Sequence, residues 1–270
     1  MSTLQASYEI RPFPKSRRLV IDACAWGRRK HIIHALAEFD VTRARQLIRD
    51  HKVKTGERIS FTAFMAACVG KAVAEDRTLH AYRKGGKLVL FDDVDIATLV
   101  EHDIEGQKLA TFYVIRIADK KTVREIHDEI RAAQKEQVEA APQARRWKLF
   151  LSLPGFLRKP LYWWMDHSPE TRKRLGGTVV LTAIGMAGKG AGWGLPIATS
   201  TLTVTLGGIE SKPGLVGGRI EPREYLCATV SFDHDIVDGM PAARFVTRLR
   251  ELVEGAYGLS EEDAQPRTEP

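Results

Sequence analysis

Apolar residues recur at three- and four-residue steps over residues 17–50, which predicts helix in this stretch. The recurring positions are Trp26, Ile33, Leu36 and Ala37, then Ala44, Leu47 and Ile48. A more apolar helix is predicted over residues 60–75, with Ser60 as its N-cap. Helix is also predicted over residues 121–138 and 240–257. One face of the last is apolar at Phe245, Leu249, Leu252 and Val253.

Between these helices, the residue pattern predicts several strands separated by turns. Gly85-Gly86 indicates a turn between two of them. DVDIATLVEH and KLATFYVIRI continue as strands. Three later segments are rich in β-branched residues and separated by glycine turns, namely TVVLTAIG, ATSTLTVTLGGI and YLCATVSF. We therefore expect an α/β sandwich, with a large mixed sheet covered by helices. Nothing marks an internal boundary, so we predict one domain over residues 17–258, between an N-terminal extension (1–16) and a disordered tail (259–270).

Composition narrows the class of protein. Of the 270 residues, 44% are hydrophobic and 28% charged, which is the balance of a folded globular chain. The net charge of +7 favours an anionic partner: nucleic acid, an acidic lipid surface or a phosphorylated small molecule. Three scattered cysteines (Cys24, Cys68, Cys227) show neither metal-ligand nor disulfide spacing, so we expect no metal and reduced thiols. The start lacks a signal peptide and no apolar run could span a bilayer, which predicts a cytoplasmic protein.

Residues 142–175 differ in composition from the rest of the chain. They hold eight basic and two acidic residues, a net +6, and six of the 21 aromatic residues. This mixture fits a helical cover with a solvated basic rim, the wall of an apolar acceptor pocket, or weak contact with an anionic membrane. No nucleic-acid fold signature accompanies it, so we expect no nucleic-acid partner. Because Pro154 and Pro160 interrupt any helix, we favour a helix-loop-helix over an acceptor entrance.

The most informative motif lies at the end of the last predicted strand, His234-Asp-Ile-Val-Asp238-Gly239. A histidine at a strand end presents its imidazole to a cleft, and its near-neutral pKa suits removal of a proton from a thiol or hydroxyl. Asp238 is expected to hold the turn, and Gly239 to permit a backbone geometry that a Cβ would oppose. Taken alone, so short a pattern also fits a structural histidine beside a helix cap.

The longer segment FDHDIVDGMPAARFVTRLRELV resembles the active-site signature of the 2-oxoacid dehydrogenase acyltransferase catalytic domain. The segment GGTVVLTAIGMAGKGAGWGLPIAT is similar to that family's Gly-Gly-Thr-x-x-x-Ser-x-x-Gly block. ISFTAFMAACVGKAVAE, DDVDIATLV and IADKKTVREIHDEI match further blocks in the same order. AWGRRKHIIHAL and GGKLVLFDDV look closer to chloramphenicol acetyltransferase. The resemblance covers residues 17–257 and is weakest over 142–175.

This resemblance implies a chloramphenicol-acetyltransferase-like fold and a role for each matching position. His234 matches the general base, whose Nε2 takes the proton of the acceptor. Thr182 falls where the family has a serine that donates to the oxyanion, and threonine keeps that hydroxyl. Asp238 matches an aspartate that pairs with an arginine, which is Arg28 here, or Arg29 if the register shifts by one. Asp235 departs from the family, where arginine usually follows the histidine; it either raises the basicity of His234 or points to solvent.

The same resemblance implies a CoA-dependent acyltransferase without a covalently bound cofactor. The acyl donor is acyl-CoA, and the acceptor is a small molecule or a separate lipoyl protein, because no lipoyl segment is evident in the sequence. It also implies a homotrimer, or a multiple of one, in which His234 of one subunit faces Thr182 of the next. The alternative is a non-catalytic trimeric scaffold, the core subunit of a dehydrogenase-like multienzyme complex.

Overall fold

The computed structural model describes residues 8–14, 17–104, 107–136, 157–158, 160, 163, 167–184 and 190–259. Within them the elements follow the chain as α1 (Arg17–Gly27), β1 (Ile32–Asp40), α2 (Thr42–Thr55), α3 (Phe61–Ala74), η1 (Arg77–His80), β2 (Tyr82–Lys84), β3 (Lys87–Val89), β4 (Ile96–Ile104), β5 (Gln107–Ile115), η2 (Ala118–Lys120), α4 (Val123–Glu136), α7 (Pro169–Gly176), β6 (Val179–Ala183), β7 (Leu202–Val216), β8 (Arg219–Asp233) and α8 (Gly239–Glu254).

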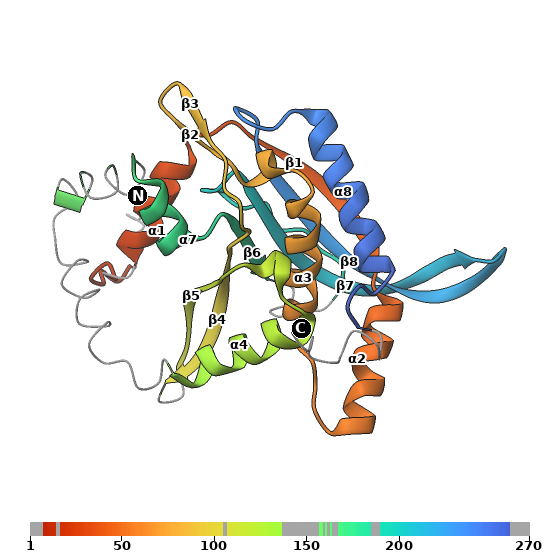
Figure 1. Ribbon diagram of the computed structural model, residues 1–270. Helices are drawn as coiled ribbons and strands as arrows, with labels where there is room; N and C mark the ends of the chain where they lie inside the picture. Colours follow the sequence, from red (N-terminus) through yellow and green to blue (C-terminus); the bar gives the residue numbers. More distant parts are fainter. Residues whose placement is uncertain are drawn as a thin grey trace, which may run out of the picture.

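Six strands form one mixed sheet in the order β1-β8-β7-β6-β4-β5. The pairs β1–β8, β7–β8 and β4–β5 are antiparallel, whereas β6 lies parallel to both β4 and β7. Helices α3, α4 and α8 pack together against the sheet, and α1 and α7 lie beside one another away from them (Figure 1). The predicted α/β sandwich, a large mixed sheet covered by helices, is confirmed.

Helix α3 is the centre of the core. It is apolar all round rather than on one stripe, as expected of a helix covered on every side. Its predicted N-cap is confirmed, since Ser60 Oγ accepts from the Ala63 N–H at 3.4 Å. Gly70 allows the backbone of η2 to approach, because a Cβ at this position would lie 2.9 Å from the carbonyl carbon of Ala118. Such close packing fixes α3 between η2, α4 and α8.

The expectation of continuous helix over residues 17–50 is wrong in its middle third. Residues 32–40 form β1, which pairs with β8 along its whole length. The deciding pattern has a period of two: Ala37 and Phe39 are buried, whereas Leu36, directly before them, is 58% exposed. In so short a stretch, apolar residues three and four positions apart fit the period of a helix as well as that of a strand. Pairing with β8 decides in favour of the strand.

Strands β7 and β8 run well beyond the segments predicted from sequence, to 15 residues each. They are joined at Gly217-Gly218, both with positive φ, the conformation that a tight hairpin turn requires. Figure 1 shows the far half of this hairpin projecting from the sheet. Leu215 and Ile220 lie opposite each other near its tip and are more than three-quarters exposed.

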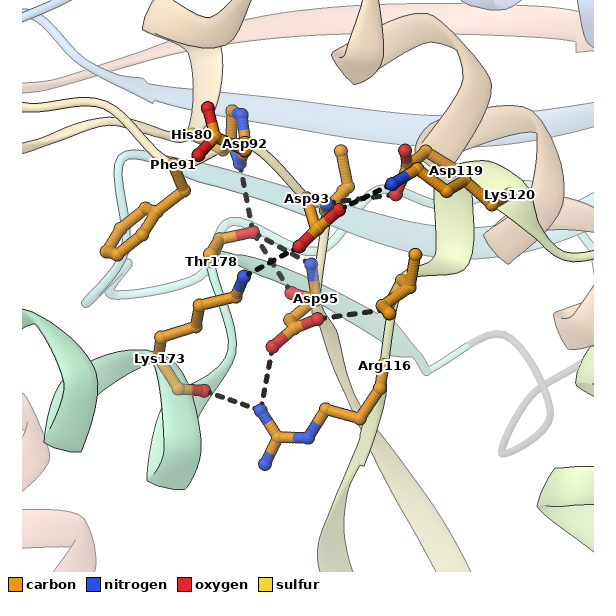
Figure 2. A network of polar contacts seen from close by, with 12 residues as sticks. His80, Phe91, Asp92, Asp93, Asp95, Arg116, Asp119, Lys120, Lys173 and Thr178 are labelled. Atoms are coloured by element: carbon orange, nitrogen blue, oxygen red, sulfur yellow. Dashed lines mark hydrogen bonds and ion pairs between the residues drawn. The ribbon is translucent and has the colours of Figure 1, made fainter.

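Asp95 joins β4 to β6, the seam between the two halves of the sheet. Its buried carboxylate accepts from the Ile117 N–H at 2.9 Å and from Arg116 Nη1 at 2.7 Å (Figure 2). Its backbone carbonyl accepts from the N–H groups of Thr178 and Val179, at 2.7 and 3.1 Å. Since both strands start here, one residue sets where the parallel pair begins.

Several predicted features lie largely outside the described residues. These are the N-terminal extension, the tail, and five of the six aromatic residues of 142–175; the sixth, Trp163, is 62% exposed. Within the part of the chain that the structure describes, every helix is too short or too polar to cross a bilayer.

Replacing Asp95 by alanine should lower the free energy of unfolding by about 3 kcal/mol, because Arg116 and the Ile117 N–H would lose a buried acceptor. Asp93→Ala is the matched control: among the described residues, the ion pairs of the more exposed Asp93 are those to Lys120 and Lys173, at 2.8 and 3.6 Å. It should cost less than about 1 kcal/mol. Urea unfolding followed by circular dichroism measures both, and equal losses would remove Asp95 from its structural role.

Candidate active site

His234 follows the last residue of β8 and lies at the surface. Its position is fixed by the β1–β8 register: Asp233 pairs with Ile32, and the His234 N–H donates to the His31 carbonyl at 2.7 Å. The His234 side chain is 45% exposed, and its Nδ1 lies 3.7 Å from Asp238 Oδ1, too far for a hydrogen bond. Among the described residues the imidazole has no hydrogen-bond partner, so both ring nitrogens are open to an incoming ligand.

Asp238 and Gly239 lie where the turn leads into α8. Asp238 is the N-cap of α8, but its side chain accepts no capping hydrogen bond and is 87% exposed. Gly239 has no positive φ, and a Cβ there would meet no atom within 4 Å. The expectation that Gly239 is needed for a special backbone geometry is therefore wrong, since an ordinary helix start suffices.

Asp233 and Asp235, on either side of His234, are held by the segment before β1. Asp233 is buried and forms an ion pair with Lys30. Asp235 Oδ1 contacts His31 Nδ1 at 2.8 Å, and its other oxygen lies 3.7 Å from Arg83. The hydrogen bond from His31 is the main reason that the pKa of Asp235 is lowered. Asp235 thus neither points freely to solvent nor bonds to His234; it ties the turn to β2.

Sequence reasoning missed Lys30, His31 and Arg83. The sequence did contain a signal: the basic run 28–31 precedes β1, and Asp233 and Asp235 flank His234 at the end of β8. Using it required the strand register, which places Ile32 opposite Asp233. Once this pairing is known, the cation before one strand and the carboxylate at the end of the other must meet.

Thr182 lies in β6, half-buried and facing the same side of the sheet as Thr205, its partner on β7. Thr205 in turn pairs with Thr229 on β8, five residues before His234. At 3.3 Å per residue and 4.8 Å per strand, His234 and Thr182 are separated by about 16 Å along the strands and about 10 Å across them. One chain therefore does not bring the two residues together.

Arg28 follows α1 directly and is exposed, as is Arg29. Among the described residues, no ion pair or hydrogen bond joins either side chain to Asp238. Their pairing with Asp238 stays a prediction.

One group of possible metal ligands occurs among the described residues: Glu57, His127 and Asp128, with ligand atoms within 4.8 Å of one another. The Ser60 N–H donates to His127 Nδ1 at 3.1 Å, which fixes the ring proton on Nε2. That nitrogen faces Glu57 at 3.5 Å and has no lone pair for a metal. The group is a polar contact between α4 and the start of α3.

Two of the three cysteines offer no nucleophile. Cys68 and Cys227 are buried, and burial raises the pKa of the Cys68 thiol, which disfavours its thiolate. Cys24 is partly buried on α1.

Comparison with known proteins supports the resemblance to acyltransferase catalytic domains. Residues 168–260 match the family model for the 2-oxoacid dehydrogenases acyltransferase (catalytic domain). A dihydrolipoyllysine-residue succinyltransferase component of the 2-oxoglutarate dehydrogenase complex from Saccharomyces cerevisiae is 26% identical over 213 residues, 78% of this chain and 39% of that protein. A lipoamide acyltransferase component of the branched-chain alpha-keto acid dehydrogenase complex from Bacillus subtilis is 23% identical, over 81% of this chain and 46% of that protein. The chain thus spans less than half the length of either relative.

Solved structures share the fold. A probable dihydrolipoamide acetyltransferase from Listeria monocytogenes superposes with a TM-score of 0.70 and 19% identity, covering 96% of this chain and 98% of that one. The cubic core of the pyruvate dehydrogenase multienzyme complex gives 0.70 and 16%, covering 95% and 96%. The resemblance to the 2-oxoacid dehydrogenase acyltransferase catalytic domain is confirmed.

His80 supports the segment that leads into β6. It is buried, and its Nδ1 lies 3.1 Å from the Thr178 hydroxyl, which also accepts from the Asp95 N–H (Figure 2). Its Nε2 is buried without a partner among the described residues. Burial is the main cause that lowers the pKa of His80 from 6.5 to about 4. The ring is therefore neutral in the folded protein near pH 7.

Acid should destabilise the protein partly through His80. Between pH 6.5 and about 4, His80 binds a proton in the unfolded chain but not in the folded chain. The free energy of unfolding therefore falls as pH falls, by up to about 3 kcal/mol. His80→Gln removes this contribution. Urea unfolding at pH 4.5, 5.5 and 6.5 should show a shallower pH dependence for the variant than for the wild type; parallel profiles would contradict it.

Proposed function

We propose that this protein is a CoA-dependent acyltransferase in which His234 is the general base. One observation carries the proposal: His234 is fixed by its backbone at the end of β8, while its imidazole is exposed and unbonded within the described part of the chain. A base must be positioned yet free to take a proton. The relatives named above are acyltransferase components, which supports the same reaction class.

The reaction is direct transfer. His234 Nε2 takes the proton of an acceptor thiol or hydroxyl, and the freed oxygen or sulfur attacks the thioester carbonyl of acyl-CoA. The C–S bond to CoA then breaks, and the departing thiolate takes the proton back from the imidazolium. Cys68 and Cys227 are buried, so neither is offered for a covalent intermediate.

The second copy of the chain is part of the proposed site. Thr182 is assigned as the oxyanion donor, yet it lies far from His234 in its own chain. A cyclic homotrimer, or a multiple of one, would bring His234 of one subunit to Thr182 of the next. One of the structural neighbours is the core of a multienzyme complex, which favours such an assembly. The same contact would cover the exposed side chain of Asp238.

The acceptor is assigned only by class. The relatives act on dihydrolipoyllysine residues or belong to lipoamide acyltransferase components, which favours a lipoyl group carried by a separate protein. A small thiol or alcohol would use the same proton transfer at His234.

His234→Ala should fold normally and lose acyl transfer by about 10²–10⁴-fold, the usual cost of a missing general base. His31→Ala is the matched control, a neighbouring histidine that is 81% exposed and whose Nδ1 contacts Asp235. It should lose less than about tenfold. Release of free CoA from acyl-CoA, in the presence of dihydrolipoamide, measures both. A folded His234→Ala protein with wild-type turnover would remove His234 from the mechanism, whereas a wild-type protein that releases no CoA would favour the scaffold.

A further inference from the structure

A second concave site lies beside the His234 turn. It is a pocket of about 310 Å³ between the C-terminal end of α1, the β2–β3 hairpin, α7 and the aspartates on either side of His234. Its volume suits a small molecule. His234 is not among the residues that line it, so the proton transfer proposed for His234 takes place outside this space.

Positive charge dominates the lining. The cations are Arg29, Lys30, Arg83, Lys84 and Arg172. The two carboxylates, Asp233 and Asp235, leave an excess of three positive charges. Both carboxylates already have partners, since Asp233 binds Lys30 and Asp235 binds His31. A concave wall of this charge concentrates anions and repels cations.

Two of these cations have no partner of their own. Among the described residues, the side chains of Arg29 and Lys84 make no hydrogen bond or ion pair, and both are exposed at the pocket. Arg29 comes from the end of α1 and Lys84 from the hairpin. Charges that approach from two separate elements suit a ligand with more than one anionic group.

The floor of the pocket is rigid and aromatic. The Arg172 guanidinium lies 5.1 Å from the ring centre of Tyr82 and 5.8 Å from that of Trp26. Arg172 Nη2 also donates to the Thr199 carbonyl at 3.0 Å, which holds the guanidinium in place. A planar, pre-positioned guanidinium between aromatic rings recognises phosphate or carboxylate at little entropic cost.

We propose that this pocket binds a small molecule that carries two or more phosphate or carboxylate groups. Arg29 and Lys84 reach its anionic groups from two separate elements, and the held guanidinium of Arg172 contacts it as well. The proposal is independent of acyl transfer, because its test measures binding alone.

Calorimetric titration of the wild-type protein with inorganic pyrophosphate, at 0.15 M salt, tests the proposal. The double variant Arg29→Gln/Lys84→Gln should bind at least tenfold more weakly, and its folding should be intact because neither side chain has a partner among the described residues. The matched control is Arg43→Gln/Lys52→Gln on α2, which removes the same charge away from the pocket. It should bind pyrophosphate as the wild type does. Equal weakening in both double variants, or no binding at millimolar pyrophosphate, would overturn the site.

Further titrations identify the source of the anion. Citrate in place of pyrophosphate, again weakened by Arg29→Gln/Lys84→Gln, supports a carboxylate ligand, whereas pyrophosphate alone supports phosphate. CoA is then added to the pyrophosphate complex. Displacement assigns the pocket to the phosphates of the acyl donor, and binding of CoA without displacement assigns it to a separate anionic molecule.

Discussion

The fold depends on the seam at Asp95. The sheet has two parts, the β4–β5 hairpin and the β6-β7-β8-β1 group, which meet only where β4 pairs with β6. Both strands begin at this seam, where the Asp95 carboxylate and carbonyl together satisfy backbone donors on η2 and β6. Gly177 lies against it with φ of +65°, and a Cβ there would approach the Asp95 carbonyl oxygen to 2.7 Å. A side chain at 177 would therefore push β6, and with it Thr182, away from its position.

The pairing register of β6, β7 and β8 sets the distance between the two proposed catalytic groups, Thr182 and His234. Thr182, Thr205 and Thr229 stand side by side on three strands, and His234 lies beyond the end of the third. The sheet is rigid, so no small movement within one chain closes a gap of this size. In the proposed reaction, the exposed base and the remote hydroxyl act together when a second copy supplies the missing half. The incomplete surroundings of His234 and Asp238 are consistent with that requirement.

Local patterns in the sequence predicted local structure well. The apolar run of α3 with Ser60, the turn at Gly85-Gly86 and the amphipathic α8 all appear in the structure, because each depends on neighbours within one turn or hairpin. The prediction failed at β1, where pairing with a strand almost 200 residues away outweighed a helical spacing. For the same reason the Lys30–Asp233 and His31–Asp235 contacts, like the pocket beside them, could not be predicted before the register was known. The roles of His234 and Thr182 came from resemblance to a family. The prediction that Gly239 permits a backbone geometry closed to other residues was wrong.

The central claim is that the active site forms between two copies of the chain, and a mixing experiment tests it most directly. His234→Ala and Thr182→Ala subunits are unfolded together, refolded at equal amounts and assayed for CoA release, beside each variant treated alone. Random assembly gives about a quarter of the interfaces a native His234 and a native Thr182, so the mixture should regain roughly a quarter of wild-type turnover. A mixture no more active than the average of the two separate variants, from subunits shown to have exchanged, would contradict a site shared between chains.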